Sequence, residues 1–93
     1  MNKYEILYIL ASNLDEAVKE AQIEKYSALV TANGGEVESV NKWGNKRFAY
    51  EIDGKNDGYY VLMNFTAKSD LPQEIERQMK ISDEVIRYMT VRK

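Results

Sequence analysis

The alternation of apolar and polar residues along the chain predicts four strands. Residues 3–11 are rich in Ile, Leu and Tyr at both odd and even positions, which indicates a strand that is apolar on both faces. Residues 36–52 alternate on either side of Trp43-Gly44-Asn45, where the chain either turns back as a hairpin or forms a bulge within one bent strand. Two further apolar segments predict strands over residues 59–67 and 85–91.

Stripes of like residues at helical spacing predict two helices. In the first, residues 14–32, polar residues recur at steps of three or four and apolar residues fall on the opposite side. Asn13 and Glu16 have the spacing of a capping box, which places the start of this helix. Gly34 supplies the left-handed residue that commonly ends a helix.

The second predicted helix covers residues 71–80, with Asp70 as its N-cap. Residues 53–58 are rich in Gly, Asn and Asp and predict the turn between the second and third strands. The element order is then β-α-β-β-α-β, within one α+β domain that covers residues 1–93. This order predicts a ferredoxin-like split β-α-β sandwich, a four-stranded antiparallel sheet with both helices on one face.

The charge is distributed unevenly, although the net charge of the 93 residues is only -2. The cations gather in residues 41–50 and 85–93, and neither segment contains an acid. Two basic segments could contact phosphate even though the whole chain is slightly acidic. The apolar run over residues 6–11 is too short to cross a membrane and carries no cleavage site, so we expect a cytoplasmic protein.

Residues that carry chemistry are scarce. The chain has no histidine and no cysteine, which removes the commonest general base, thiol nucleophile and metal ligands. The acid pairs Asp15-Glu16 and Asp83-Glu84 are sequence neighbours at helix ends or turns, and we interpret them as surface residues. We therefore predict no enzyme, no cofactor and no metal site, and a function in binding.

Two other classes of this fold fit the sequence poorly. An acylphosphatase-like enzyme needs an arginine-bearing loop after the first strand, where this chain has Ala11-Ser12-Asn13. An RNA-recognition motif places exposed aromatic residues on its central strands. Here Tyr60 occupies a position where that motif expects a small residue, and Tyr8 falls on the face assigned to the helix-covered core.

Two features point to a binding surface. The sheet face away from the helices carries several apolar residues, and an exposed apolar patch implies a partner; these residues are Leu7, Ile9, Tyr60, Leu62 and Met89. In residues 42–50 cations alternate with aromatic residues, a pattern that suits phosphate contacts and base stacking. The aromatic residues of this segment could equally be packed in the protein.

An ordered set of segments resembles the family of bacterial small-subunit ribosomal protein six, nearly without gaps and over essentially the whole chain. The segments are Tyr4-Glu5, Asn13-Leu14-Asp15, Lys46-Arg47-Phe48-Ala49-Tyr50, Gly58-Tyr59 and residues 81–89. The resemblance implies one long bent second strand, so we prefer the bulge at Trp43-Gly44 to a hairpin. Two positions depart from the family pattern. Asn2-Lys3 stands where the family often has two basic residues, and Lys46 stands where it has an arginine. Unlike arginine, lysine cannot form two parallel hydrogen bonds to one phosphate.

The resemblance also implies the function. Members of this family pair with ribosomal protein eighteen, and the pair binds the central domain of small-subunit ribosomal RNA during assembly. We therefore expect a structural component of the cytoplasmic ribosome that is monomeric when isolated.

These expectations assign two sets of residues. The predicted RNA-binding residues are Lys3, Lys46, Arg47, Arg87, Arg92 and Lys93. The predicted partner-binding residues are Trp43, Tyr60 and Leu62. Trp43 could instead fold inward as part of the core.

Two other functions remain open from the sequence. One is a homodimeric ferredoxin-like regulatory or small-molecule-binding domain, with the uncovered sheet face as its dimer interface. The other is an enzyme of the dimeric α+β barrel type, which the missing histidine weakens. A mass measurement in solution separates a monomeric ribosomal protein from a stable dimer.

Overall fold

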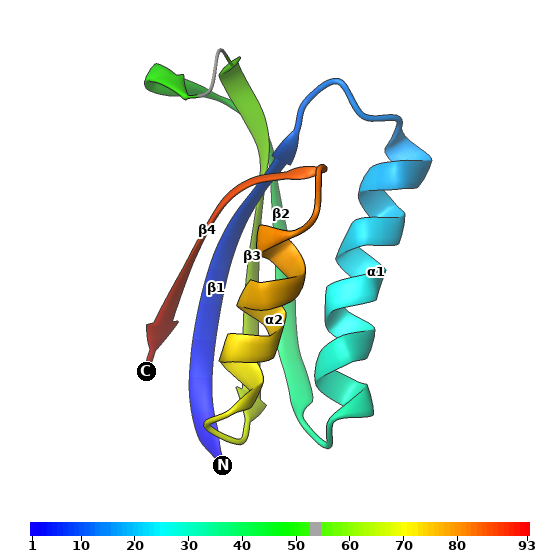
Figure 1. The fold of residues 1–93 in the computed structure, drawn as a ribbon, viewed down its shortest axis with the longest axis vertical. Coiled ribbons are helices and arrows are strands. Elements are labelled where there is room, and N and C mark those ends of the chain that lie inside the picture. The colour runs from blue at the N-terminus through cyan, green and yellow to red at the C-terminus, as the bar shows by residue number, and fades with distance from the viewer. Residues whose placement is uncertain (53–54) are drawn as a thin grey trace.

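Strands and helices follow one another in the predicted order β-α-β-β-α-β (Figure 1). This computed structural model describes the backbone of residues 1–52 and 55–93 and the side chains of residues 1–47 and 56–93. The elements are β1 (Asn2–Ala11), α1 (Glu16–Ala32), β2 (Glu36–Ile52), β3 (Lys55–Ala67), α2 (Leu71–Lys80) and β4 (Val85–Arg92).

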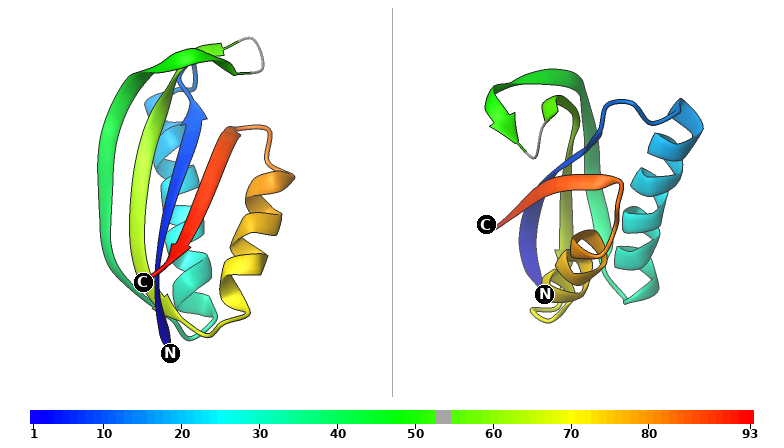
Figure 2. Two further views of the ribbon diagram at one scale, coloured as in Figure 1. Left: turned by 90° about the vertical axis from the view of Figure 1, so that its left-hand side faces the viewer. Right: turned by 45° about the horizontal axis from the view of Figure 1, so that its top comes forward.

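The described strands form one four-stranded antiparallel sheet in the order β2-β3-β1-β4. β1 lies in the middle and pairs with β3 on one side and with β4 on the other. Both helices cover the same face of the sheet, and the other face is open (Figure 2). The predicted ferredoxin-like sandwich is therefore confirmed.

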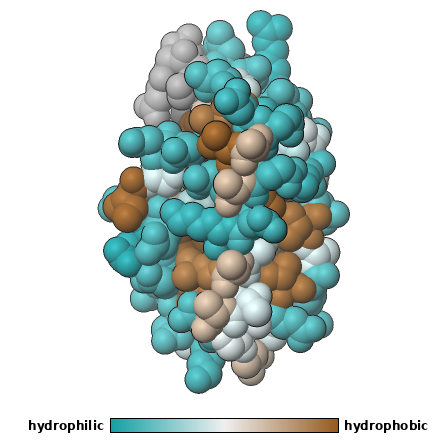
Figure 3. All heavy atoms as spheres, turned by 90° about the vertical axis from the view of Figure 1, so that its right-hand side faces the viewer, coloured by the Kyte–Doolittle hydropathy of each residue, from teal (hydrophilic) through white to brown (hydrophobic). Residues whose placement is uncertain are grey.

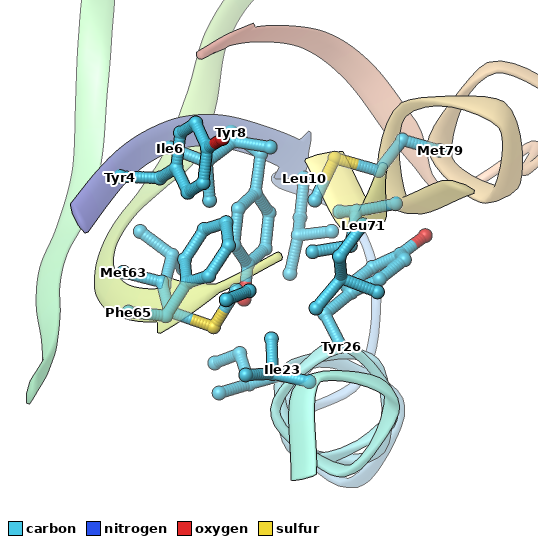
Figure 4. Packing of buried hydrophobic residues seen from close by; sticks show 14 residues of the cluster. Tyr4, Ile6, Tyr8, Leu10, Ile23, Tyr26, Met63, Phe65, Leu71 and Met79 are labelled. Carbon is cyan, nitrogen blue, oxygen red and sulfur yellow. The ribbon is translucent and has the colours of Figure 1, made fainter. Parts of the chain in front are cut away.

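The core lies between the sheet and the helices. The even residues of β1 and the odd residues of β3 point toward α1 and α2, as Figure 4 shows for Tyr8 and Phe65. Tyr8 packs edge-on against Tyr26 of α1, with ring centroids 5.4 Å apart. Burial raises the pKa of the Tyr8 hydroxyl far above its usual value, so the ring stays neutral at any ordinary pH. The predicted placement of Tyr8 in the core is confirmed.

The start of α1 differs from the prediction. The helix begins at Glu16, and its N-cap is Asp15, whose side chain forms no capping hydrogen bond. The predicted capping box of Asn13 and Glu16 is therefore wrong, because Asn13 lies two residues too early and is exposed. The predicted end is confirmed: Gly34 has φ 79°, and its amide donates to the carbonyl of Thr31.

The buried face of α1 includes a cation that the apolar pattern did not indicate. Lys19 is almost fully buried, and its ammonium lies 4.9 Å from the centre of the Tyr59 ring. The aliphatic stem of a lysine can cover apolar surface while its charge meets an aromatic face. Lys19 therefore belongs to the buried stripe of α1, whose other buried residues are Ile23, Tyr26 and Val30.

β2 is one long strand with a bulge, as the family resemblance implied. Its pairing with β3 shifts between Lys42 and Gly44, and Gly44 adopts φ 86°. A residue with positive φ inserted into one strand is a common form of β-bulge, and it re-aims the side chain beside it. The hairpin alternative at Trp43-Gly44-Asn45 is excluded.

β3 begins at Lys55, four residues before the predicted start at Tyr59. Asp57 pairs with Arg47 of β2, and its carboxylate accepts a hydrogen bond of 2.8 Å from the Ser12 hydroxyl. The predicted turn over residues 53–58 is thus too long, and residues 53–54 of it lie outside the described part of the chain. The bounds predicted for α2 are confirmed, although the Asp70 side chain forms no capping hydrogen bond.

Candidate protein and RNA interface

The open sheet face carries an apolar patch, which we define as Leu7, Ile9, Tyr60, Leu62 and Met89. The register brings these residues together, because Leu7 pairs with Leu62 of β3 and with Met89 of β4. Met89 is 59% exposed, and a depression of about 250 Å³ lies over Leu7, Ile9 and Tyr60. The side of the molecule that α1 covers differs, since mainly hydrophilic side chains line it (Figure 3). The register confirms that the predicted apolar residues lie on the open face, but Ile9 is buried there, with only 7% of its surface exposed.

Beyond the apolar patch, the open face carries the exposed Val91 of β4 and a group of polar side chains that the sequence pattern did not predict. The Lys93 ammonium lies 3.3 Å from the Glu5 carboxylate and donates a hydrogen bond of 2.7 Å to Asn64. Asn64 in turn donates to the Ser39 hydroxyl at 3.1 Å. We call Glu5, Ser39, Asn64 and Lys93 the polar network. It satisfies its own hydrogen bonds, so the apolar patch is the part of this face suited to a dry contact.

Trp43 lies on the open face, 46% exposed, and not in the core. Its ring stacks on that of Tyr60, with centroids 6.2 Å apart and planes at 8°. The bulge at Gly44 produces this outward orientation. Trp43 therefore extends the apolar patch onto β2, and Leu62 lies half-buried between Leu7 and Asn41.

Lys46 joins this aromatic pair to the basic segment of β2. Its ammonium lies 5.5 Å from the centre of the Trp43 ring, a cation–π contact. Among the described residues, no acid lies within salt-bridge distance of the Lys46 ammonium or the Arg47 guanidinium. Lys42 differs, because its ammonium donates to both Glu20 oxygens at 2.7 and 2.9 Å, which raises the pKa of Lys42.

The six predicted RNA-binding residues fall into separate groups. Lys3, Arg92 and Lys93 gather where β1 begins and β4 ends: the Lys93 amide donates to the Lys3 carbonyl, and Arg92 donates to Asn2. Lys46 and Arg47 lie toward the opposite end of the sheet, where β2 and β3 extend past the other strands (Figure 1).

Arg87 lies between these two groups. The alternation of side chains along a strand further separates the six predicted RNA-binding residues. Arg87 pairs with Ile9 on the open face, at the rim of the depression over the apolar patch. Lys46 and Arg47 are consecutive strand residues, so their side chains leave opposite faces of β2. The sequence showed which segments carry the six cations. Only the strand register shows that one flat RNA surface cannot contact all six of them.

Comparisons with known proteins match this fold and these segments. A sequence model of the family described as "Ribosomal protein S6" matches residues 3–92. The chain belongs to the ribosomal protein S6 family. It is 49% identical over 92 residues to small ribosomal subunit protein bS6 of Alkaliphilus oremlandii, covering 99% of this chain and 97% of that one. It is 47% identical over 91 residues to the bS6 protein of Clostridium acetobutylicum, covering 98% and 96% of the two chains.

The S6 fold is also seen in a solved relative. The crystal structure of 30S ribosomal protein S6 from Thermotoga maritima matches with a TM-score of 0.93 at 30% identity, covering 99% of this chain and 87% of that one. The family that the sequence resemblance indicated is thus confirmed. The strands that carry the apolar patch and the bulge belong to the part shared with that S6 structure.

Two further observations concern other kinds of site in this S6 family member. Within the described residues, no three Asp, Glu, His or Cys side chains are placed so that they could hold a metal ion. None of the described helices is long and apolar enough to span a membrane.

Proposed function

We propose that this chain is a structural component of the small ribosomal subunit that binds small-subunit ribosomal RNA together with ribosomal protein eighteen. Family membership supports the ribosomal role. The observation that links RNA binding to binding of the protein partner is the contact of Lys46 with Trp43, which itself stacks on Tyr60. This contact brings a cation suited to phosphate next to aromatic residues suited to a protein partner.

The protein partner docks on the apolar patch and the adjoining Trp43. Trp43, Tyr60 and Leu62 are its anchors, because large side chains near the centre of an interface dominate the binding energy. The chain acts as one domain over residues 1–93 and is monomeric when isolated, in the cytoplasm. The RNA contacts are the cations at the two ends of the sheet together with Arg87. With a net charge of -2, the isolated chain binds RNA weakly and the pair binds it better.

Affinity measurements with the purified pair and a central-domain RNA fragment test this proposal. Trp43→Ala should weaken the affinity for ribosomal protein eighteen by about 30-fold, which corresponds to about 2 kcal/mol. Lys46→Gln combined with Arg47→Gln should lower the salt slope of RNA binding by about 2, one for each lost phosphate contact. Lys80→Gln removes an exposed cation on α2, outside the RNA-binding set, and should leave the slope unchanged.

Sedimentation of the isolated chain tests the competing function. A monomer is expected. A stable dimer that Met89→Glu dissociates would instead identify the apolar patch as a homodimer interface, as in a regulatory domain. An unchanged RNA slope for the double variant of Lys46 and Arg47 would remove these two residues from the RNA contact.

A further inference from the structure

A polar basin lies beside the Lys46–Trp43 contact, where β2 and β3 extend past β1. It measures about 410 Å³ and falls within the size range of small-ligand sites. The residues that line it, which we call the β2–β3 basin, are Asn45, Lys46, Arg47, Asn56 and Asp57. The residue directly opposite Lys46 is Gly58, and because glycine has no side chain, space is left across the two strands.

The charges of the basin suit the phosphates of an RNA strand. Lys46 and Arg47 supply two cations that no acid in the described part of the chain neutralises through a salt bridge. The one acid in the lining, Asp57, already accepts the Ser12 hydroxyl at 2.8 Å. That hydrogen bond directs an oxygen of the carboxylate toward the loop after β1. The basin thus carries an excess of positive charge.

The two amides of the basin suit the edge of a nucleobase. An asparagine side chain offers a donor and an acceptor side by side, the arrangement that pairs with base edges. Among the described residues, neither the Asn45 nor the Asn56 side chain forms a hydrogen bond, whereas Asn64 is fully engaged in the polar network. Both amides are exposed at the rim of the basin.

We infer that the β2–β3 basin holds one unpaired nucleotide of an RNA strand. The two phosphates that flank this nucleotide contact Lys46 and Arg47, one on each face of the edge strand β2, and the edge of its base contacts Asn45 and Asn56. This inference rests on the proposed function, because it deepens the role of the two cations. It adds base recognition to a contact that the cations alone would make with any sequence.

Trp43 provides a direct signal of occupancy. It is the one tryptophan of the chain, and Lys46 lies over its ring. A phosphate that binds Lys46 draws the ammonium away from the ring, so the fluorescence of Trp43 changes as the basin fills. Lys46→Gln abolishes that change without removing the fluorophore.

The test uses the full chain in complex with its protein partner, and central-domain RNA fragments in which single unpaired nucleotides are exchanged. Asn45→Ala with Asn56→Ala should lower the affinity about tenfold for one base identity, and the salt slope should stay unchanged. Asn41→Ala, an exposed amide of the same strand outside the basin, is the matched control and should have no effect.

The outcomes separate this inference from the proposed function. In one outcome, the Lys46 and Arg47 variants weaken RNA binding, but the double amide variant binds every fragment like the unmodified chain. The basin then does not distinguish bases, and this inference fails while the proposed function stands. If neither set changes RNA binding, the proposed RNA contact of these cations fails as well. A mononucleotide that changes Trp43 fluorescence at the same concentration as the RNA would identify a free nucleotide as the occupant and overturn the inference.

Discussion

Trp43 and Tyr60 lie flat against each other on the open face of the sheet, with ring centroids 6.2 Å apart and planes at 8°. The stack makes one unit of two residues that come from different strands. A partner that contacts either ring therefore depends on the position of both. Since Lys46 lies over Trp43, the same unit also reaches the basic end of β2.

Trp43→Ala should change the stability of the chain only modestly. The side chain is 46% exposed, so its loss removes mainly the stacking contact, at about 1 kcal/mol. Phe65→Ala is the contrasting variant, because Phe65 is fully buried and its removal should cost about 3–5 kcal/mol. Urea unfolding measures both values. Equal losses for the two variants would place Trp43 in the core.

Two glycines should respond differently to alanine. A Cβ added at Gly35 would lie 2.7 Å from the Thr66 carbonyl oxygen and 2.9 Å from Cγ1 of Val30, so the backbone must move. Gly44 has φ 86° but open space around the added atom, so Gly44→Ala costs only the conformational strain of about 1 kcal/mol. Thermal unfolding should therefore show the larger loss for Gly35→Ala, and Gly44→Asn should be milder than Gly44→Ala. A larger loss for Gly44→Ala would contradict the steric argument.

The stability of the chain should depend on Glu74 at acidic pH. Hydrogen bonds from Arg77 and then from Gln78 lower the pKa of the Glu74 carboxyl from 4.5 to about 2. A carboxyl whose pKa is lower in the folded state stabilises the fold above its unfolded pKa, and this contribution is lost as the pH falls from 4.5 to 2. Stability curves over this range should be shallower for Glu74→Gln and for Arg77→Gln. Because the pair is exposed, the difference should shrink at high salt.

Lys42→Gln should leave RNA affinity unchanged, although Lys42 belongs to the same basic segment as Lys46. Its ammonium is bound to Glu20 on the helix-covered side of the sheet, away from Trp43. Lys46→Gln is the matched comparison and should weaken RNA binding by the pair. Filter binding at several salt concentrations distinguishes the two. A weaker affinity with Lys42→Gln would mean that RNA displaces Glu20.

The sequence predicted the elements well and the placement of side chains less well. Periodicity located α2 at its observed bounds, because Leu71, Ile75 and Met79 mark one buried side of a single helix. The bounds of β2 also agree with the prediction, but its course as one strand through Gly44 was indicated by the family resemblance and not by the pattern. The sequence pattern misplaced the start of α1, since Asn13 and Asp15 are both good capping residues and only packing chooses between them. It missed the first residues of β3, whose polar and glycine-rich sequence resembles a turn while its backbone pairs with β2.

The candidate site likewise has features that could be predicted from the sequence and features that could not. The apolar patch could be predicted, because alternation along each strand assigns the faces. The polar network could not, since Lys93 reaches Glu5 and Asn64 only through the register of three strands. The stacking of Trp43 on Tyr60 likewise depends on the shift of register at the bulge, and the sequence gives no measure of that shift.

The central position of β1 has a consequence for how the chain is made. Leu7 and Ile9 find their neighbours Met89 and Arg87 on a strand that is synthesised much later. Until β4 leaves the site of synthesis, one edge of β1 has exposed amide and carbonyl groups and an apolar flank. Pairing between residues so distant in sequence is also slow to form. The growing chain therefore passes through a stage at which another extended segment can take the place of β4, and a chaperone that covers this edge would protect it.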